Sequence, residues 1–244
     1  MQTRDGHSVT GAGSGRRPGR DSERTQSAIL AAATREFARH GLGGARVDRI
    51  AARARTNKRM LYYYFGRKDA LFLAVLENTY ATIRKAEQRL SMLDVPPAEG
   101  IRRLIHFTWD YYVAHPEFLT LLNSENLHGA KHLRRSRQVL AMNSPLIETL
   151  RTVLARGGDA GIFRGGVDAL QLYVSIAALS YFYLGNNHTL SAVFGRDLAT
   201  PASRKERLAH MTDMILGYLR PERRGPQRPA RPITAAAAID ERPR

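Results

Sequence analysis

The chain has 244 residues, of which 43% are apolar, enough for a small and a medium domain or for one larger helical body. It has no cysteine, which excludes disulfide scaffolds, thiolate zinc sites and cysteine nucleophiles. The net charge of +16 favours a polyanionic partner, nucleic acid before membrane, although an arginine preference set by genome base composition would also produce it.

Both ends of the chain are poor in apolar residues. We expect a disordered basic arm over residues 1–22 and a disordered Pro/Arg-rich tail over 221–244. Arg16, Arg17 and Arg20 either add phosphate contacts or are simply solvated. The sequence has no apolar run of transmembrane length and no secretory h-region, so we expect a cytoplasmic location and no membrane partner.

Between the ends, apolar residues recur at helical spacing and no alternating strand pattern occurs, so the predicted fold class is all-α. The first helix carries Ile29, Ala33 and Phe37 and is expected to stop at Gly41. The other expected helices cover about 47–54, 61–65, 71–90, 98–114, 116–127, 131–156, 167–186 and 202–219. The predicted breaks between the later helices are His115-Pro116, Gly157-Gly158 and Asn186-Asn187.

Residues 47–65, VDRIAARARTNKRMLYYYF, have the pattern of a short helix, a tight turn and a second short helix. The spacing places Ile50, Ala51, Leu61 and Phe65 inward, and we expect Tyr64 to face inward too. Lys58, Arg59, Tyr62 and Tyr63 remain on an outward face, which is suited to a DNA major groove. Between residues 46 and 68 the charged residues are one acid, Asp48, and eight bases: Arg46, Arg49, Arg53, Arg55, Lys58, Arg59, Arg67 and Lys68. This local density favours nucleic acid.

The segment of about residues 25–71 resembles the TetR/AcrR family of bacterial helix-turn-helix transcriptional regulators. The matching pieces are TQSAILAAATREFARHG, VDRIAARA and NKRMLYYYFGRKDALF, of which the aromatic run followed by Gly66 and Lys68 is the most diagnostic. The resemblance implies base-edge contacts from Lys58, Arg59 and Tyr62, a backbone or thymine-methyl contact from Tyr63, and a phosphate contact from Lys68.

Three positions depart from the family pattern. Arg55 stands where a turn glycine is usual, and Met60 is bulkier than the usual residue. Arg46 replaces the Ser or Thr that caps the second helix and touches phosphate; an arginine can still reach a phosphate, so Arg46 stays among the predicted DNA-binding residues.

The resemblance implies a three-helix head over residues 23–71 and a larger C-terminal helical domain for ligand binding and dimerisation over 72–220. Residues 168–184 are apolar on nearly every face, and Leu208, Met211, Ile215 and Tyr218 form a stripe on the last helix. We therefore expect a homodimer through helices about 167–186 and 202–219, with a well-packed monomeric core as the alternative.

An effector pocket is expected where aromatic and apolar residues precede a polar stretch. The predicted ligand-binding residues are Phe107, Tyr111, Leu122, Glu125, Asn126, His128 and Tyr173. For any one of them a role in the core or on the surface is an equal alternative. The family resemblance suggests an aromatic or amphipathic small molecule as the effector.

These observations predict a TetR-like DNA-binding regulator that a small-molecule effector releases from a palindromic double-stranded DNA operator, which would make it a repressor. A ligand-independent architectural DNA-binding protein and a transcriptional activator are the alternatives. The sequence contains no glycine-rich phosphate loop and no HExxH motif, so we expect no enzyme activity and no cofactor. The histidines at 106, 115, 128 and 132 do not follow a ligand spacing, and we expect no metal site.

Overall fold

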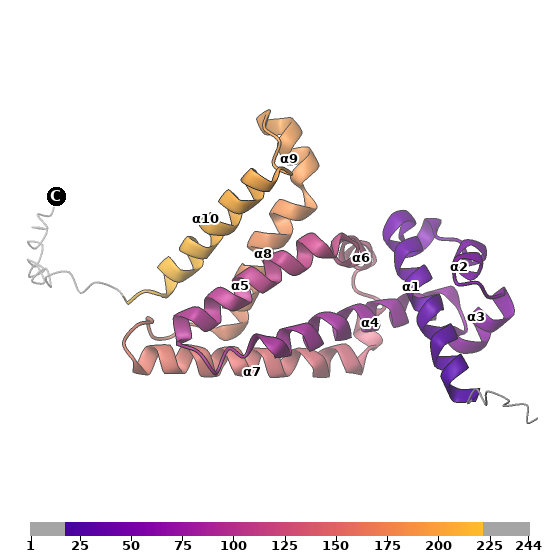
Figure 1. The fold of residues 1–244 in the computed structure, drawn as a ribbon, viewed down its shortest axis with the longest axis horizontal. Coiled ribbons are helices and arrows are strands. Elements are labelled where there is room, and N and C mark those ends of the chain that lie inside the picture. Colours follow the sequence, from indigo (N-terminus) through magenta and orange to yellow (C-terminus); the bar gives the residue numbers. More distant parts are fainter. Residues whose placement is uncertain (1–17, 222–244) are drawn as a thin grey trace, which may run out of the picture.

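The computed structural model describes residues 18–221, with side chains from residue 21 onward except that of Ser144, and this range is helical with no strand (Figure 1). The helices, in chain order, are α1 (Pro18–Gly44), α2 (Val47–Arg53), α3 (Lys58–Phe65), α4 (Lys68–Glu87), α5 (Pro97–Ala114), α6 (Pro116–Leu127), α7 (Arg137–Asp159), α8 (Ala169–Gly185), α9 (Asn187–Phe194) and α10 (Pro201–Leu219). Short 3-10 turns follow α4 and precede α7. The all-α prediction is confirmed for the described residues.

The predicted arm and tail lie mostly outside the described residues. Where they overlap, the prediction for residues 18–22 is wrong, because α1 already begins at Pro18. Proline suits the start of a helix, since its missing N–H has no helical partner there. The predicted stop at Gly41 is a kink with φ 63°, and the helix continues to Gly44.

Two boundaries in the second half of the chain differ from the predictions. The predicted break at Gly157-Gly158 is wrong, because α7 continues to Asp159. A Cβ on Gly157 would lie 1.9 Å from the Phe163 ring, so this glycine allows close packing and does not end the helix. The start of α7 is at Arg137 instead of 131, where the Ser136 hydroxyl accepts a hydrogen bond from Val139 N–H.

The helix α9 was not predicted. Its apolar residues include Val193 and Phe194, which are exposed, so the segment carries no inward stripe that a periodicity argument could detect.

The described residues contain two large apolar cores and a smaller aromatic cluster of α4, α5 and α6 around Phe118. The first lies in the head, and its fully buried residues include Ile29, Phe37, Ile50, Leu61 and Phe72. The second is built from α5, α7, α8 and α10.

The helix α4 belongs both to the DNA-binding head and to the larger C-terminal helical domain, which is called the body below. Its first turns supply Leu71, Phe72, Val75 and Leu76 to the head core, and it then runs along α7 in the body (Figure 1). The expected boundary after residue 71 therefore falls inside a helix that both halves share. The helix α6 adds a second connection, since it packs on α1 and its Leu121 completes the head core.

Among residues 18–221, no helix combines the length and the apolarity needed to span a membrane.

Candidate DNA-binding site

The carboxylate of Glu36 in α1 holds α2 in place. Glu36 is fully buried; its Oε1 accepts a hydrogen bond from the Arg46 N–H at 3.1 Å and lies 2.7 Å from Arg49 Nε. Its Oε2 accepts a hydrogen bond from Arg53 at 3.0 Å. Burial acts to raise the pKa of Glu36, but the Arg46 N–H and the nearby cations outweigh it and lower that pKa. Glu36 thereby satisfies one backbone N–H at the N-terminus of α2, where the Arg46 side chain provides no cap.

The turn between α2 and α3 depends on one residue with a left-handed backbone. Arg55 has φ 51°, a left-handed backbone of the kind that a turn glycine adopts more easily. The next N–H, that of Thr56, bonds back to the Ala51 carbonyl at 3.0 Å. The chain then enters α3, where the Asn57 side chain accepts a hydrogen bond from Met60 N–H at 2.9 Å.

The outward face of α3 is the one predicted from the spacing. Leu61 is fully buried and anchors the helix, whereas Lys58 and Arg59 are exposed. Tyr62 and Tyr63 are 49% and 76% exposed, which is far more than buried aromatic residues of a core retain. A short helix therefore presents two cations and two aromatic rings on its free side.

The other two aromatics of the run support the helix from behind. Tyr64 is half-buried against the head core, and its ring meets that of Tyr63 edge-to-face at 5.1 Å. Phe65 is half-buried in the same core, and Gly66 with φ 69° ends the helix. The inward orientation expected of Tyr64 and Phe65 is thus confirmed, although neither is fully covered.

Part of the basic density of the head is neutralised within the protein. Lys58 forms an ion pair with Asp48 of α2, both side chains being about half exposed. Arg49 and Arg53 bind Glu36 and are 41% and 39% exposed. The count of eight bases against one acid therefore overstates the charge that is free to meet DNA.

The remaining predicted contacts lie near the ends of helices. The Lys68 ammonium, at the start of α4, donates to the Gly43 carbonyl at 3.3 Å, so it stabilises the end of α1 in the absence of DNA. Arg46 lies exposed at the N-terminus of α2, and its backbone is bound as described above.

The predicted effector residues have separate packing and hydrogen-bonding partners. The rings of Phe107 and Tyr111 of α5 lie 5.7 Å apart and tilted, in an aromatic cluster with Phe118, and Leu122 packs against the same cluster. Asn126 is exposed at the end of α6. These residues form packing between α5 and α6 and an adjoining surface.

Glu125 and His128 have structural partners. Glu125 is buried and accepts hydrogen bonds from the backbone N–H groups of His132 and Leu133 at 2.7 and 2.9 Å. Its second oxygen lies 2.7 Å from His132 Nδ1. Burial raises the pKa of Glu125, but these hydrogen bonds outweigh it and lower that pKa. The Nδ1 atom of His128 is engaged by the Ser124 carbonyl at 2.6 Å.

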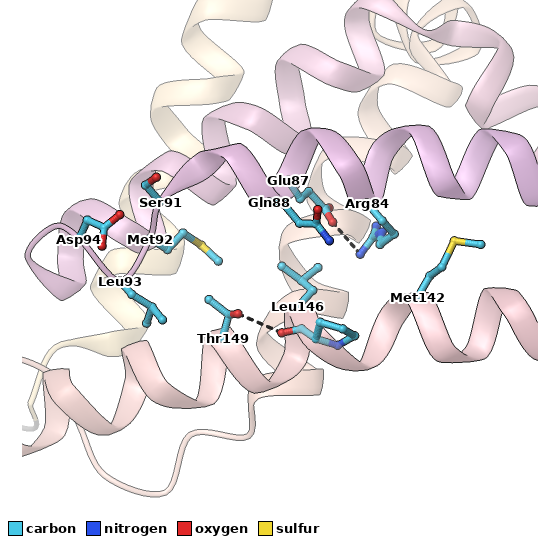
Figure 2. A pocket seen from close by; sticks show the side chains of 11 residues that line it. Arg84, Glu87, Gln88, Ser91, Met92, Leu93, Asp94, Met142, Leu146 and Thr149 are labelled. Carbon is cyan, nitrogen blue, oxygen red and sulfur yellow. Dashed lines mark hydrogen bonds and ion pairs between the residues drawn. The ribbon is translucent and has the colours of Figure 1, made fainter.

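Tyr173 belongs to a different polar group in the body. Its hydroxyl accepts a hydrogen bond from Arg84 of α4 at 2.7 Å, and Arg84 also pairs with Glu87 at 2.9 Å. Arg84 and Glu87 line a cavity of about 310 Å³ between α4 and α7, which includes none of the predicted effector residues (Figure 2).

Three residues that matter here were missed from the sequence. A signal existed for Glu36, because an acid seven residues after Ile29 falls on the inward face of α1. For Arg84 and Glu87, a charged pair three residues apart is usually a solvated helix face, and only the packing of α7 and α8 shows that this pair is buried.

A first helix with one buried face, the short second helix, the left-handed turn and the exposed face of α3 define a helix-turn-helix DNA-binding head. Comparison with known proteins agrees. The family model described as "Bacterial regulatory proteins, tetR family" matches residues 29–75, and the model "Tetracyclin repressor-like, C-terminal domain" matches residues 97–215.

Curated relatives and solved structures extend the match along the chain. The chain is 40% identical to the HTH-type transcriptional repressor NicS of Pseudomonas putida over 199 residues, 82% of this chain and 94% of NicS. It is 36% identical to the HTH-type transcriptional repressor SCO4008 of Streptomyces coelicolor over 164 residues, 66% of this chain and 79% of that protein. The crystal structure of the regulator SCO4942 from Streptomyces coelicolor superposes with a TM-score of 0.62 at 28% identity, covering 80% of this chain and 98% of SCO4942. The chain belongs to the TetR family of bacterial regulatory proteins.

Proposed function

We propose that this chain is a dimeric transcriptional repressor that binds a two-fold symmetric DNA operator through α3 and releases it when a small-molecule effector binds the body. The observation that carries the proposal is the exposed face of Lys58, Arg59, Tyr62 and Tyr63 on a helix anchored by buried Leu61. Relatives at 40% and 36% identity are named as repressors, which supports repression over activation.

The face contains the groups that major-groove recognition uses. Long cations reach the guanine O6 and N7 acceptors, and aromatic rings contact thymine methyl groups. In this proposal the side chain of Arg46, and the backbone N–H groups at the start of α4 beside Lys68, contact phosphates. Lys58 must give up its ion pair with Asp48 to contact DNA, so this pair lowers the affinity for DNA.

An apolar stripe on α8 supports the dimer. Leu170, Val174 and Phe182 recur at intervals of four and eight residues, and they are 50%, 49% and 59% exposed. On the neighbouring α10, Met214 and Tyr218 are 47% and 50% exposed. An apolar surface spanning two helices favours association, and a two-fold axis through it would place one head in each half-site.

A reporter experiment tests the function. The DNA upstream of the protein's own gene drives a reporter in a heterologous host, with the wild-type chain or the Lys58→Ala, Arg59→Ala double variant supplied in trans. We expect the wild type to lower expression at least tenfold and the variant to have lost this effect. A matched control removes two exposed arginines of the body, Arg102→Ala and Arg151→Ala, and should repress like the wild type. Increased expression with the wild type would contradict repression, and equal repression by both double variants would contradict the role of α3.

A further inference from the structure

Arg55, in the turn between α2 and α3, combines an unfavourable backbone with a side chain that has no partner. Among residues 18–221, the residues other than glycine with a positive φ are Arg55, Ser91 and Ala130. Of these, only Arg55 is charged. A left-handed backbone destabilises a residue that has a Cβ, and residues held in such conformations cluster at functional sites.

The conformation of the turn does not depend on the Arg55 side chain. The Arg55 N–H donates to the Ala52 carbonyl at 3.1 Å, and the Thr56 N–H donates to the Ala51 carbonyl at 3.0 Å. The side chain is exposed and forms no hydrogen bond or ion pair with the described residues. A glycine would adopt this turn with less strain, so no contact within the fold explains an arginine here.

The nearest arginines of α2 differ from Arg55. Arg49 and Arg53 bind the buried Glu36, at 2.7 and 3.0 Å. Their charges are therefore partly neutralised within the protein, whereas the charge of Arg55 is not. A free positive charge at the edge of the recognition helix attracts an anion.

The position of Arg55 selects a DNA phosphate as that anion. Arg55 precedes Lys58, the first residue of α3, by three positions and lies outside the helix. When the N-terminal residues of a recognition helix contact base edges, the turn before the helix lies at the edge of the major groove, where the sugar–phosphate backbone runs. A guanidinium binds a phosphate through two parallel hydrogen bonds, a geometry that suits arginine at this edge.

We propose that Arg55 binds a phosphate at the edge of the major groove that α3 enters, once in each half-site of the operator. The inference rests on the proposed function, because it requires α3 to lie in the groove. The chain thereby gives up stability in the turn and gains affinity for DNA that does not depend on the base sequence.

A structural role at the end of α2 is the alternative. Arg55 follows Ala54, the C-cap of α2, and a cation is favourable beside the partial negative charge of a helix C-terminus. The two roles predict opposite results for Arg55→Gly. A phosphate contact predicts a more stable protein that binds DNA more weakly, whereas a role in α2 predicts a less stable protein with unchanged DNA binding.

The test measures DNA binding of the full chain by fluorescence anisotropy at several salt concentrations. The two probes are the duplex that the chain protects upstream of its own gene and a scrambled duplex of the same length and composition. Arg55→Gly should weaken binding to both duplexes at least fivefold, because phosphates are common to every sequence. The slope of log K against log salt should become less steep by about 0.9 per protomer, and urea unfolding should show a more stable protein.

Three further variants separate charge from backbone. Arg55→Asn tolerates the left-handed backbone but has no charge, so it should bind as weakly as Arg55→Gly. Arg55→Lys keeps the charge and should bind at least threefold more tightly than Arg55→Gly. Arg102→Ala removes an exposed cation of the body and should bind like the wild type.

The outcomes separate this contact from the proposed function. Equal affinity of Arg55→Gly and the wild type refutes the contact, and so does Arg55→Lys binding no better than Arg55→Gly. If Arg55→Gly binds weakly but the Lys58→Ala, Arg59→Ala variant binds the protected duplex like the wild type, the role of α3 fails and the contact of Arg55 with DNA stands. A wild-type chain that binds neither duplex refutes both.

Discussion

Replacing Glu36 by alanine removes the buried carboxylate through which α1 holds α2. The change leaves the Arg46 N–H without its partner and breaks contacts to Arg49 and Arg53. Removing one partner of a fully buried ion pair costs about 3–5 kcal/mol, but these guanidinium groups are 41% and 39% exposed and can turn to water. We therefore expect a loss of about 2–3 kcal/mol in the free energy of unfolding, and a Tm lower by roughly 5–10 °C.

The pH dependence of this loss provides a second check. The Glu36 pKa is lowered in the folded protein, so the ionised carboxylate adds stability above the ordinary glutamate pKa of about 4.3. That contribution is lost as the pH falls through the lower folded-state value. The difference between wild type and Glu36→Ala should be full at pH 7 and should shrink below about pH 4.

Urea unfolding followed by circular dichroism measures both quantities. Glu148→Ala, which breaks the exposed pair with Arg151, serves as the control and should cost no more than about 0.5 kcal/mol. A Glu36→Ala cost as small as that of the control, or a cost that stays constant from pH 7 to pH 3.5, would refute the reasoning.

Four further predictions follow from single residues. Arg55→Gly relieves a left-handed backbone and should raise the free energy of unfolding by about 1 kcal/mol in urea titrations; a loss would contradict this. Asp48→Asn frees Lys58 and should tighten operator binding up to about fivefold in anisotropy measurements at low salt, whereas weaker binding would show that Asp48 orients Lys58 for DNA. Met214→Glu should shift the sedimentation coefficient from dimer to monomer, and an unchanged dimer would place the interface elsewhere. The pKa of Glu87 is raised to about 7 in the folded protein, so the wild type loses stability as the pH rises from 5 to 8 and this carboxyl ionises. The free energy of unfolding of Glu87→Gln should therefore increase relative to the wild type by on the order of 2 kcal/mol over this pH range in urea titrations. A difference that stays constant with pH would contradict the raised pKa.

The parts of the fold that follow from local pattern could be predicted from the sequence. The face of α3 depends only on helical periodicity around Leu61, and the exposures of Tyr62 and Tyr63 agree with it. The starts of α5 and α6 follow from Pro97 and from Pro116, because proline is suited to the first turn of a helix.

Features that depend on tertiary packing could not be predicted. Gly157 resembles a helix stop in sequence but is required by the ring of Phe163, which follows six residues later and packs back on it. Glu125 resembles a polar pocket residue, yet its partners His132 and Leu133 lie across a turn whose geometry no periodicity describes. The Arg84–Glu87 pair is buried because of α7 and α8, which are distant in sequence.

A footprint on the DNA upstream of the protein's own gene, with the wild-type chain and the Lys58→Ala, Arg59→Ala variant side by side, tests the central claim most directly. The wild type should protect two half-sites whose centres lie about 10 base pairs, or a multiple of one helical turn, apart. The variant should protect neither half-site while keeping the wild-type circular dichroism. Equal protection by both proteins would contradict the assignment of α3 as the recognition helix.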